Sequence, residues 1–101
     1  MSAEHAVIVE FKYGLNDLGP LREAESRLDA AIRSAGAGEY DGDEVAADLS
    51  DGSLYMYGPD ADQLYAAIRS VLESAAVMRG ATVHVRYGPP GSREKVIIVG
   101  D

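Results

Sequence analysis

The feature that most constrains this chain is the way its apolar residues change spacing along the sequence. In three short segments residues alternate between two faces, one of them apolar, which is the pattern of a β-strand with one buried face, and two more short apolar segments are bounded by turn residues. In two longer segments the apolar residues recur three and four positions apart, as they do along one side of an α-helix. The expected strands are residues 6–13, 44–49, 54–57, 81–87 and 95–99, and the expected helices are residues 21–35 and 61–75.

The order of these segments predicts the fold class. A strand-helix-strand-strand-helix-strand order with short hairpins favours one antiparallel sheet with both helices on one face, the ferredoxin-like plan. We expect residues 1–101 to form a single α+β domain, a two-layer sandwich with strand order 4-1-3-2 and the fifth strand outside the fourth. Residues 50–53 are expected to connect the second and third strands, with Gly52 at a positive φ. The expected core residues are Val7, Val9, Phe11, Leu28, Ile32, Val45, Leu49, Leu54, Met56, Leu64, Ile68, Leu72, Val83 and Val85.

Polar residues mark where the two helices begin. Pro20 suits the first turn of the first helix, and Asp17 or Gly19 is expected to cap it. Asp60 followed by Gln63 has the spacing of a capping box for the second helix.

The negative charge of the chain is concentrated in one segment. The net charge is −8 at pH 7, and no Lys or Arg occurs between Arg33 and Arg69. Residues 39–62 contain eight Asp and Glu residues, of which Asp51, Asp60 and Asp62 suit a turn or a helix start. An acidic surface disfavours nucleic acid, whose binding depends on neutralising phosphates, and it favours a basic partner protein. The five acids expected to contact that partner are Glu39, Asp41, Asp43, Glu44 and Asp48.

The sheet face away from the helices is a second candidate for partner binding. Strand alternation places Ile8, Tyr55 and Tyr57 on it, which makes it more apolar than a solvated face needs to be. We expect this face or the apolar segment 96–99 to mediate a homodimer, because an exposed edge strand can pair with another chain.

His84 is the strongest catalytic candidate in the sequence. It is expected to face Glu10 on the neighbouring strand, which would raise the basicity of the imidazole, and Arg86 lies two positions further on. Catalysis also needs a nucleophile, an oxyanion donor or a metal, and the sequence indicates none of them. We therefore expect cross-strand electrostatic pairs, with a small enzyme that uses His84 as an alternative. No cofactor or metal is expected, since the acidic residues 41–44 lack EF-hand spacing.

One short segment resembles a known family. Residues 17–21, Asp-Leu-Gly-Pro-Leu, are similar to the Asp-x-Pro-Gly-x-Leu turn of the ACT domain, with Pro and Gly transposed. The resemblance implies a βαββαβ regulatory module that binds an amino acid at a dimer interface. Helix initiation at Pro20 explains the same residues without a ligand. A non-catalytic interaction or inhibitor protein is therefore the expected function, and small-ligand regulation is the alternative.

The sequence also predicts where the protein resides. No apolar run reaches the ~18–20 residues that a membrane span needs, and residues 1–5 lack the basic start of a signal peptide. There is no cysteine, which removes disulfides and thiolate chemistry. We expect a cytoplasmic protein.

Overall fold

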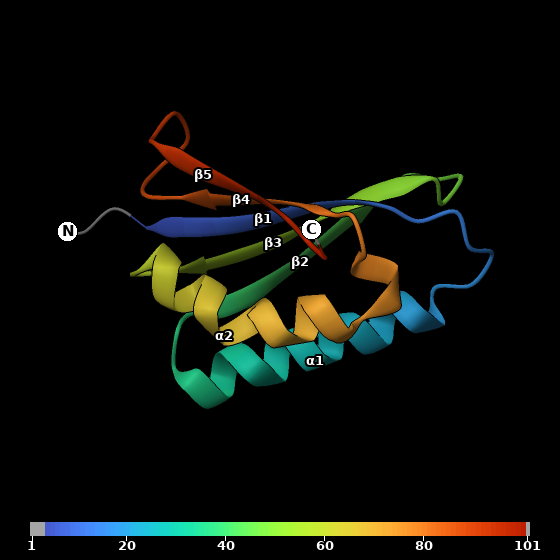
Figure 1. Cartoon of the computed structure of the whole chain (residues 1–101), viewed down its shortest axis with the longest axis horizontal. Coiled ribbons are helices and arrows are strands. Elements are labelled where there is room, and N and C mark those ends of the chain that lie inside the picture. The colour runs from blue at the N-terminus through green and yellow to red at the C-terminus, as the bar shows by residue number, and fades with distance from the viewer. Residues whose placement is uncertain (1–3, 101) are drawn as a thin grey trace.

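The computed structural model describes residues 4–100, which form two layers (Figure 1). One layer is an antiparallel sheet, and the other consists of two α-helices that lie against one face of the sheet. The strands are β1 (His5–Lys12), β2 (Glu39–Val45), β3 (Asp51–Gly58), β4 (Thr82–Arg86) and β5 (Glu94–Ile98). The helices are α1 (Gly19–Ala35) and α2 (Ala61–Ser74), followed by a short 3-10 helix η1 (Ala76–Met78) that no apolar spacing predicts.

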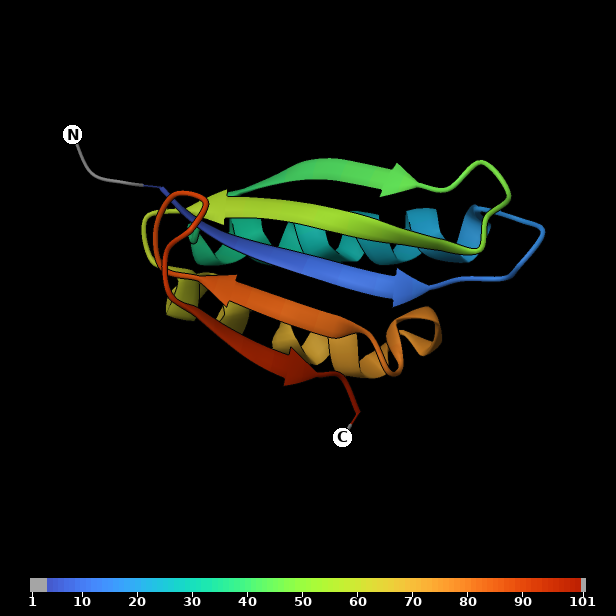
Figure 2. The same cartoon turned by 90° about the horizontal axis from the view of Figure 1, so that it is seen from above.

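The strands lie in the order β2-β3-β1-β4-β5, which confirms the predicted order (Figure 2). Each neighbouring pair is antiparallel, and β1 is the central strand between β3 and β4. The arrangement is an α+β sandwich with an open five-stranded sheet, consistent with a ferredoxin-like plan that carries one extra strand.

The hydrophobic core fills the space between the sheet and the helices. Val7, Val9 and Phe11 alternate along β1 and are buried, as are the predicted helix residues of α1 and α2. All the predicted core residues are buried except Val45 and Leu49, which are only partly buried. Buried hydrophobic residues that the prediction did not include are Ala6, Leu21, Ala24, Ala37, Ala61, Met78, Ala81 and Val99.

The second strand begins earlier than predicted, and the prediction of residues 44–49 was wrong. Residues 46–50 form a turn, in which the carboxylate of Asp48 accepts hydrogen bonds from the Ser50 backbone N–H at 3.1 Å and from its hydroxyl at 2.7 Å. Leu49 adopts a φ of 61° there, which no strand residue has. Such a side-chain-to-backbone turn competes with strand pairing. The apolar spacing of Val45, Ala47 and Leu49 is that of a strand, but Ala47 and Leu49 belong to this turn.

Gly52 has a different role from the one predicted. It lies inside β3 and has no positive φ. A Cβ atom at this position would lie 2.8 Å from the carbonyl oxygen of Glu44 and 2.9 Å from Cζ of Phe11. Glycine is therefore required here because β2 and the Phe11 ring approach the β3 backbone closely.

The two helices begin in different ways. Asp60 caps α2 as predicted, and its carboxylate accepts hydrogen bonds from two backbone N–H groups of the first turn at 3.0 and 3.3 Å. In α1 the capping position is occupied by Leu18, which makes no side-chain cap, while the Asp17 carboxylate accepts a hydrogen bond from Gly19 N–H at 2.9 Å. No helix within residues 4–100 is long and apolar enough to cross a membrane.

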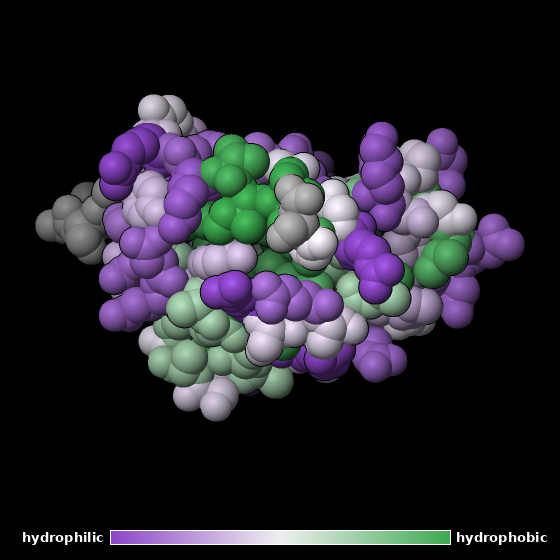
Figure 3. All heavy atoms as spheres, viewed as in Figure 1, coloured by the Kyte–Doolittle hydropathy of each residue, from purple (hydrophilic) through white to green (hydrophobic). Residues whose placement is uncertain are grey.

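The two edge strands differ in character. β2 contains four acidic residues and a register shift between Tyr40 and Gly42, which is a β-bulge or a similar irregularity. β5 carries Val96 and Ile98, whose exposed fractions are 56% and 41%. Figure 3 shows the hydrophobic cluster that covers β5 on an otherwise largely hydrophilic side of the molecule.

The close packing around Gly52 makes the first testable prediction. Gly52→Ala should destabilise the protein by about 1–3 kcal/mol, because the added methyl group overpacks against Phe11 and Glu44. Urea unfolding followed by circular dichroism measures the change. Ser53→Ala, at the next position of β3, is the control and should alter stability by less than about 0.5 kcal/mol. Equal stability of the two variants would contradict the proposed contact.

Candidate functional site

The candidate site is the face of the sheet that no helix covers, called here the open face (Figure 2). Because strand register is known, its residues can be read across neighbouring strands in rows. One row, from β2 to β5, contains Gly42, Tyr55, Ile8, His84 and Val96. The next contains Glu44, Ser53, Glu10, Thr82 and Ile98, and the row on the other side contains Glu39, Tyr57, Ala6, Arg86 and Glu94.

The predicted tyrosines lie on this face and are partly exposed. Tyr55 is paired with Ile8 on one side and with Gly42 on the other, where no side chain covers it. Partial burial and the nearby carboxylate of Glu44 raise the pKa of Tyr55. Tyr57 is paired with Ala6, which is fully buried. The open face therefore has an aromatic region on β3, between β2 and the central strand β1.

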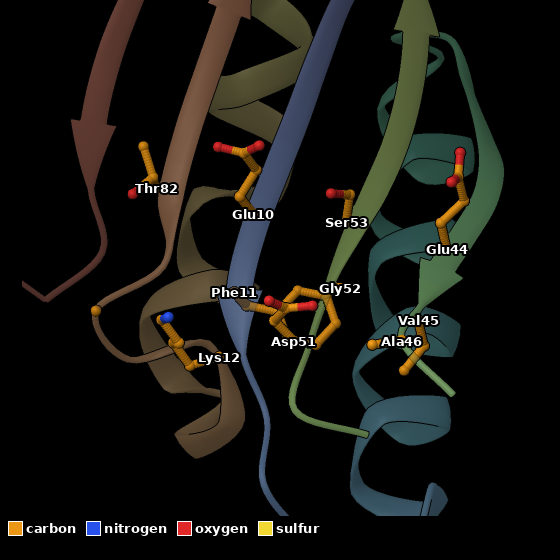
Figure 4. A pocket seen from close by; sticks show the side chains of 11 residues that line it. Glu10, Phe11, Lys12, Glu44, Val45, Ala46, Asp51, Gly52, Ser53 and Thr82 are labelled. Atoms are coloured by element: carbon orange, nitrogen blue, oxygen red, sulfur yellow. The ribbon is translucent and has the colours of Figure 1, made fainter. Parts of the chain in front are cut away.

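A groove lies on the open face beside the aromatic region (Figure 4). Its volume is about 620 Å³, and it spans the ends of four strands. Carboxylates reach it from three of these strands, at Glu10 of β1, Glu44 of β2 and Asp51 of β3. Lys12 and the hydroxyl group of Ser53 also line it. The groove is thus a polar depression with more negative than positive groups.

His84 joins three strands on the same face. Its Nε2 lies 2.8 Å from Oε1 of Glu10, and its Nδ1 lies 3.1 Å from Oε1 of Glu94. The hydrogen bond to Glu10 is the largest cause of a raised pKa of His84, and Glu94 adds to it. The expected pairing with Glu10 is present. Glu94 was missed because the sequence placed it in a loop, and only the β4–β5 register brings it to His84.

Both ring nitrogens of His84 contact carboxylates, so a substrate would have to displace Glu10 or Glu94 before it could exchange a proton with the imidazole. The two carboxylates lie at different ring nitrogens, and within residues 4–100 no group of three His, Asp or Glu side chains could hold a metal ion. Arg86 does not join the pair, since its Nε donates to the carbonyl oxygen of Gly88 at 2.7 Å.

Two of the five acids expected to bind a partner also make contacts within the fold. Asp48 holds the turn after β2, and Asp43 lies 2.5 Å from Nη1 of Arg22 on α1. The expectation that these two acids have no folding role was wrong, because the sequence does not reveal that Arg22 faces β2. The remaining three, Glu39, Asp41 and Glu44, are exposed along β2.

Asp43 belongs to a small network that attaches β2 to α1. Nη1 of Arg22 also lies 2.7 Å from Oε1 of Glu25, and the Tyr40 hydroxyl donates to the other carboxylate oxygen at 2.5 Å. Burial raises the pKa of Glu25, and burial together with the Glu25 carboxylate raises the pKa of Tyr40. This network fixes the position of β2, and with it the exposed acids on its other side.

The segment that resembles the ACT turn initiates α1. Pro20 lies in the first turn of the helix, and the Tyr13 hydroxyl donates to the carbonyl oxygen of Asp17. None of residues 17–21 lines the groove of the open face. Amino-acid binding at this segment stays a prediction.

Comparison of the chain with family models, with curated proteins and with solved structures finds no match.

The contacts of His84 predict a pH dependence. A pKa that is raised on folding adds stability in full below the unfolded value of about 6.5, and this stability is lost as the pH rises through the folded pKa. The difference in unfolding free energy between the protein and His84→Gln should therefore shrink from pH 5.5 to pH 8.5. NMR titration of the imidazole should show a lower pKa in Glu10→Gln and in Glu94→Gln. An unchanged pKa in both variants would contradict the two contacts.

The network around Glu25 makes a further prediction. Tyr40→Phe removes a hydrogen bond to a buried carboxylate and should destabilise the protein by about 1.5–3 kcal/mol in urea unfolding. Tyr65→Phe is the matched control, because the Tyr65 side chain is also partly buried and its hydroxyl makes no hydrogen bond with residues 4–100. Equal stability of the two variants would show that the Tyr40 hydroxyl does not support Glu25.

Proposed function

We propose that this chain is a non-catalytic interaction module that binds a basic segment of another protein on its open face. The observation that carries the proposal is the groove of about 620 Å³, where the carboxylates of Glu10, Glu44 and Asp51 gather beside partly exposed tyrosines. Carboxylates supply charge for Lys and Arg, and tyrosines supply the flat contact area that protein interfaces favour.

The residues around Tyr55 suit an arginine side chain. Glu39 is paired with Tyr57 and Glu44 with Ser53, the residues of β3 two positions after and two positions before Tyr55. Each of the two carboxylates is therefore diagonally opposite Tyr55. A residue at such a diagonal position lies about 7–8 Å from Tyr55, so each carboxylate is within reach of a guanidinium group that stacks on the ring. Gly42 leaves the β2 side of Tyr55 uncovered. A guanidinium could stack on the ring and donate to a carboxylate at the same time.

The exposed acids of β2 support the same kind of partner. Glu39, Asp41 and Glu44 lie at one edge of the sheet, in a stretch of sequence without Lys or Arg. A localised negative field speeds the approach of a basic protein and makes the association sensitive to salt. A basic enzyme that must be kept inactive is one partner with this chemistry, which gives the module an inhibitory role.

The arrangement of His84 favours binding over catalysis. Its two carboxylate contacts connect β1, β4 and β5, and so keep the open face in one geometry. A surface of fixed shape loses less conformational entropy when a partner binds, because its side chains are already ordered.

Affinity capture from extracts of the source cells tests the proposal. The captured partner should be basic, and its purified form should bind less tightly when salt rises from about 0.1 M to about 1 M, where the Debye length falls to about 3 Å. Glu44→Lys should lower the affinity by about tenfold or more, and Tyr55→Ala should also lower it.

Glu23→Lys is the matched control for this experiment. It makes the same change of charge on an exposed residue of α1, outside the groove of the open face, and should lower the affinity by less than about twofold. Equal losses for Glu44→Lys and Glu23→Lys would show that only the overall charge matters. Absence of any salt-sensitive partner would also contradict the proposal.

A further inference from the structure

The two edges of the sheet differ in their protection against pairing with another chain. Edge strands expose unpaired backbone groups, and proteins normally block them with charges, bulges or a covering element. β2 has exposed acids and an irregular register near Asp41. β5 pairs with β4 without a register shift, carries charges only at its start, at Glu94 and Lys95, and has Val96 and Ile98 exposed beyond them. The β5 edge is therefore the less protected one.

The hydrogen bonds of the β4–β5 hairpin show which backbone groups point outward. Tyr87 N–H donates to the Arg93 carbonyl at 3.0 Å, and Val99 N–H donates to the Ala81 carbonyl at 2.9 Å. In an antiparallel pair, hydrogen-bonded positions alternate along the strand. The backbone N–H and C=O groups of the odd-numbered residues from 93 to 99 therefore point towards β4. The backbone N–H and C=O groups of Glu94, Val96 and Ile98 point away from the sheet.

We propose that a second copy of this chain pairs with this edge, antiparallel, and joins two five-stranded sheets into one continuous sheet. A twofold axis at Ile97 places Val96 opposite Ile98 of the partner subunit. The backbone N–H and C=O groups of Val96 and Ile98 point away from β4. Val96 of one copy can therefore exchange two hydrogen bonds with Ile98 of the partner subunit. The exposed apolar side chains then cover one another on the open face. The pairing is isologous, as in most homodimers.

The distribution of charge favours a second copy as the occupant of this edge. The chain carries −8, and six of its acids lie in residues 39–51, in β2, the turn after it and the start of β3, on the opposite side of the sheet from β5. Pairing through β5 places these two groups of acids as far apart as the sheet allows, so their repulsion is weakest. Around β5 itself, Arg93 and Lys95 accompany Glu94, and Nζ of Lys95 lies 3.7 Å from the carboxylate of Asp62. Positive and negative charges are balanced at this edge, which therefore presents no net acidic barrier to an identical copy.

The oligomeric state in solution tests the proposal. Light scattering coupled to size-exclusion chromatography, over a range of protein concentrations, should show a dimer. Ile98→Lys should weaken dimerisation by at least about tenfold, which corresponds to about 1.4 kcal/mol. The matched control is Leu15→Lys, because Leu15 is 42% exposed and Ile98 is 41% exposed, and it should leave the dimer unchanged.

A second variant tests the backbone contacts. Val96→Pro removes one outward-pointing N–H and leaves the β4–β5 hydrogen bonds in place, since proline is tolerated on edge strands. It should also weaken the dimer by about tenfold, while circular dichroism verifies that the fold is retained. A monomer at every concentration, or equal dimerisation of Ile98→Lys and Leu15→Lys, would overturn the proposal.

Salt separates this proposal from the proposed function. Two copies that each carry −8 repel one another, so added salt should strengthen the dimer or leave it unchanged. Salt should weaken the binding of a basic protein. A monomer that still captures such a partner overturns the dimer alone, and a dimer that captures none overturns the interaction module alone.

Discussion

Strand β1 is the element on which the rest of the structure depends. It pairs with β3 on one side and with β4 on the other, so it fixes the register of the whole sheet. Its alternate residues Val7, Val9 and Phe11 enter the core, while Ile8 and Glu10 reach the open face. A shift of one residue would exchange these two sets and place a carboxylate in the core. The buried set therefore determines which side chains the open face presents.

An element could be predicted from the sequence where most of its apolar residues lie on one buried side. β1, α1, α2 and β4 are such elements, and the order of strands and helices along the chain was sufficient to derive the strand order of the sheet. β2 lacked this pattern, because only Tyr40 and Val45 of this edge strand pack against the core, and the rest of it contains Asp41, Gly42 and Asp43, residues that strands normally avoid. The apolar spacing just beyond it, up to Leu49, was the stronger signal and belonged to a turn.

The candidate site could be predicted in part, for the same reason. Alternation along β1, β3 and β4 placed Tyr55, Tyr57, Glu10 and His84 on one face correctly. Contacts that depend on register between distant segments could not be read from the sequence. The second partner of His84 depends on the β4–β5 pairing, and the groove depends on where β2 passes beside β3.

The acids in and beside β2 also give the molecule an electric dipole. Residues 39–51 contain six acids and no Lys or Arg, whereas around β5 Arg93 and Lys95 balance Glu94 and the nearby Asp62. In the field of a highly charged surface such a molecule experiences a torque before any contact forms. Its approach is then oriented as well as accelerated, with the β2 edge leading. A partner of opposite charge would meet the exposed acids first, and a negatively charged surface would meet β5.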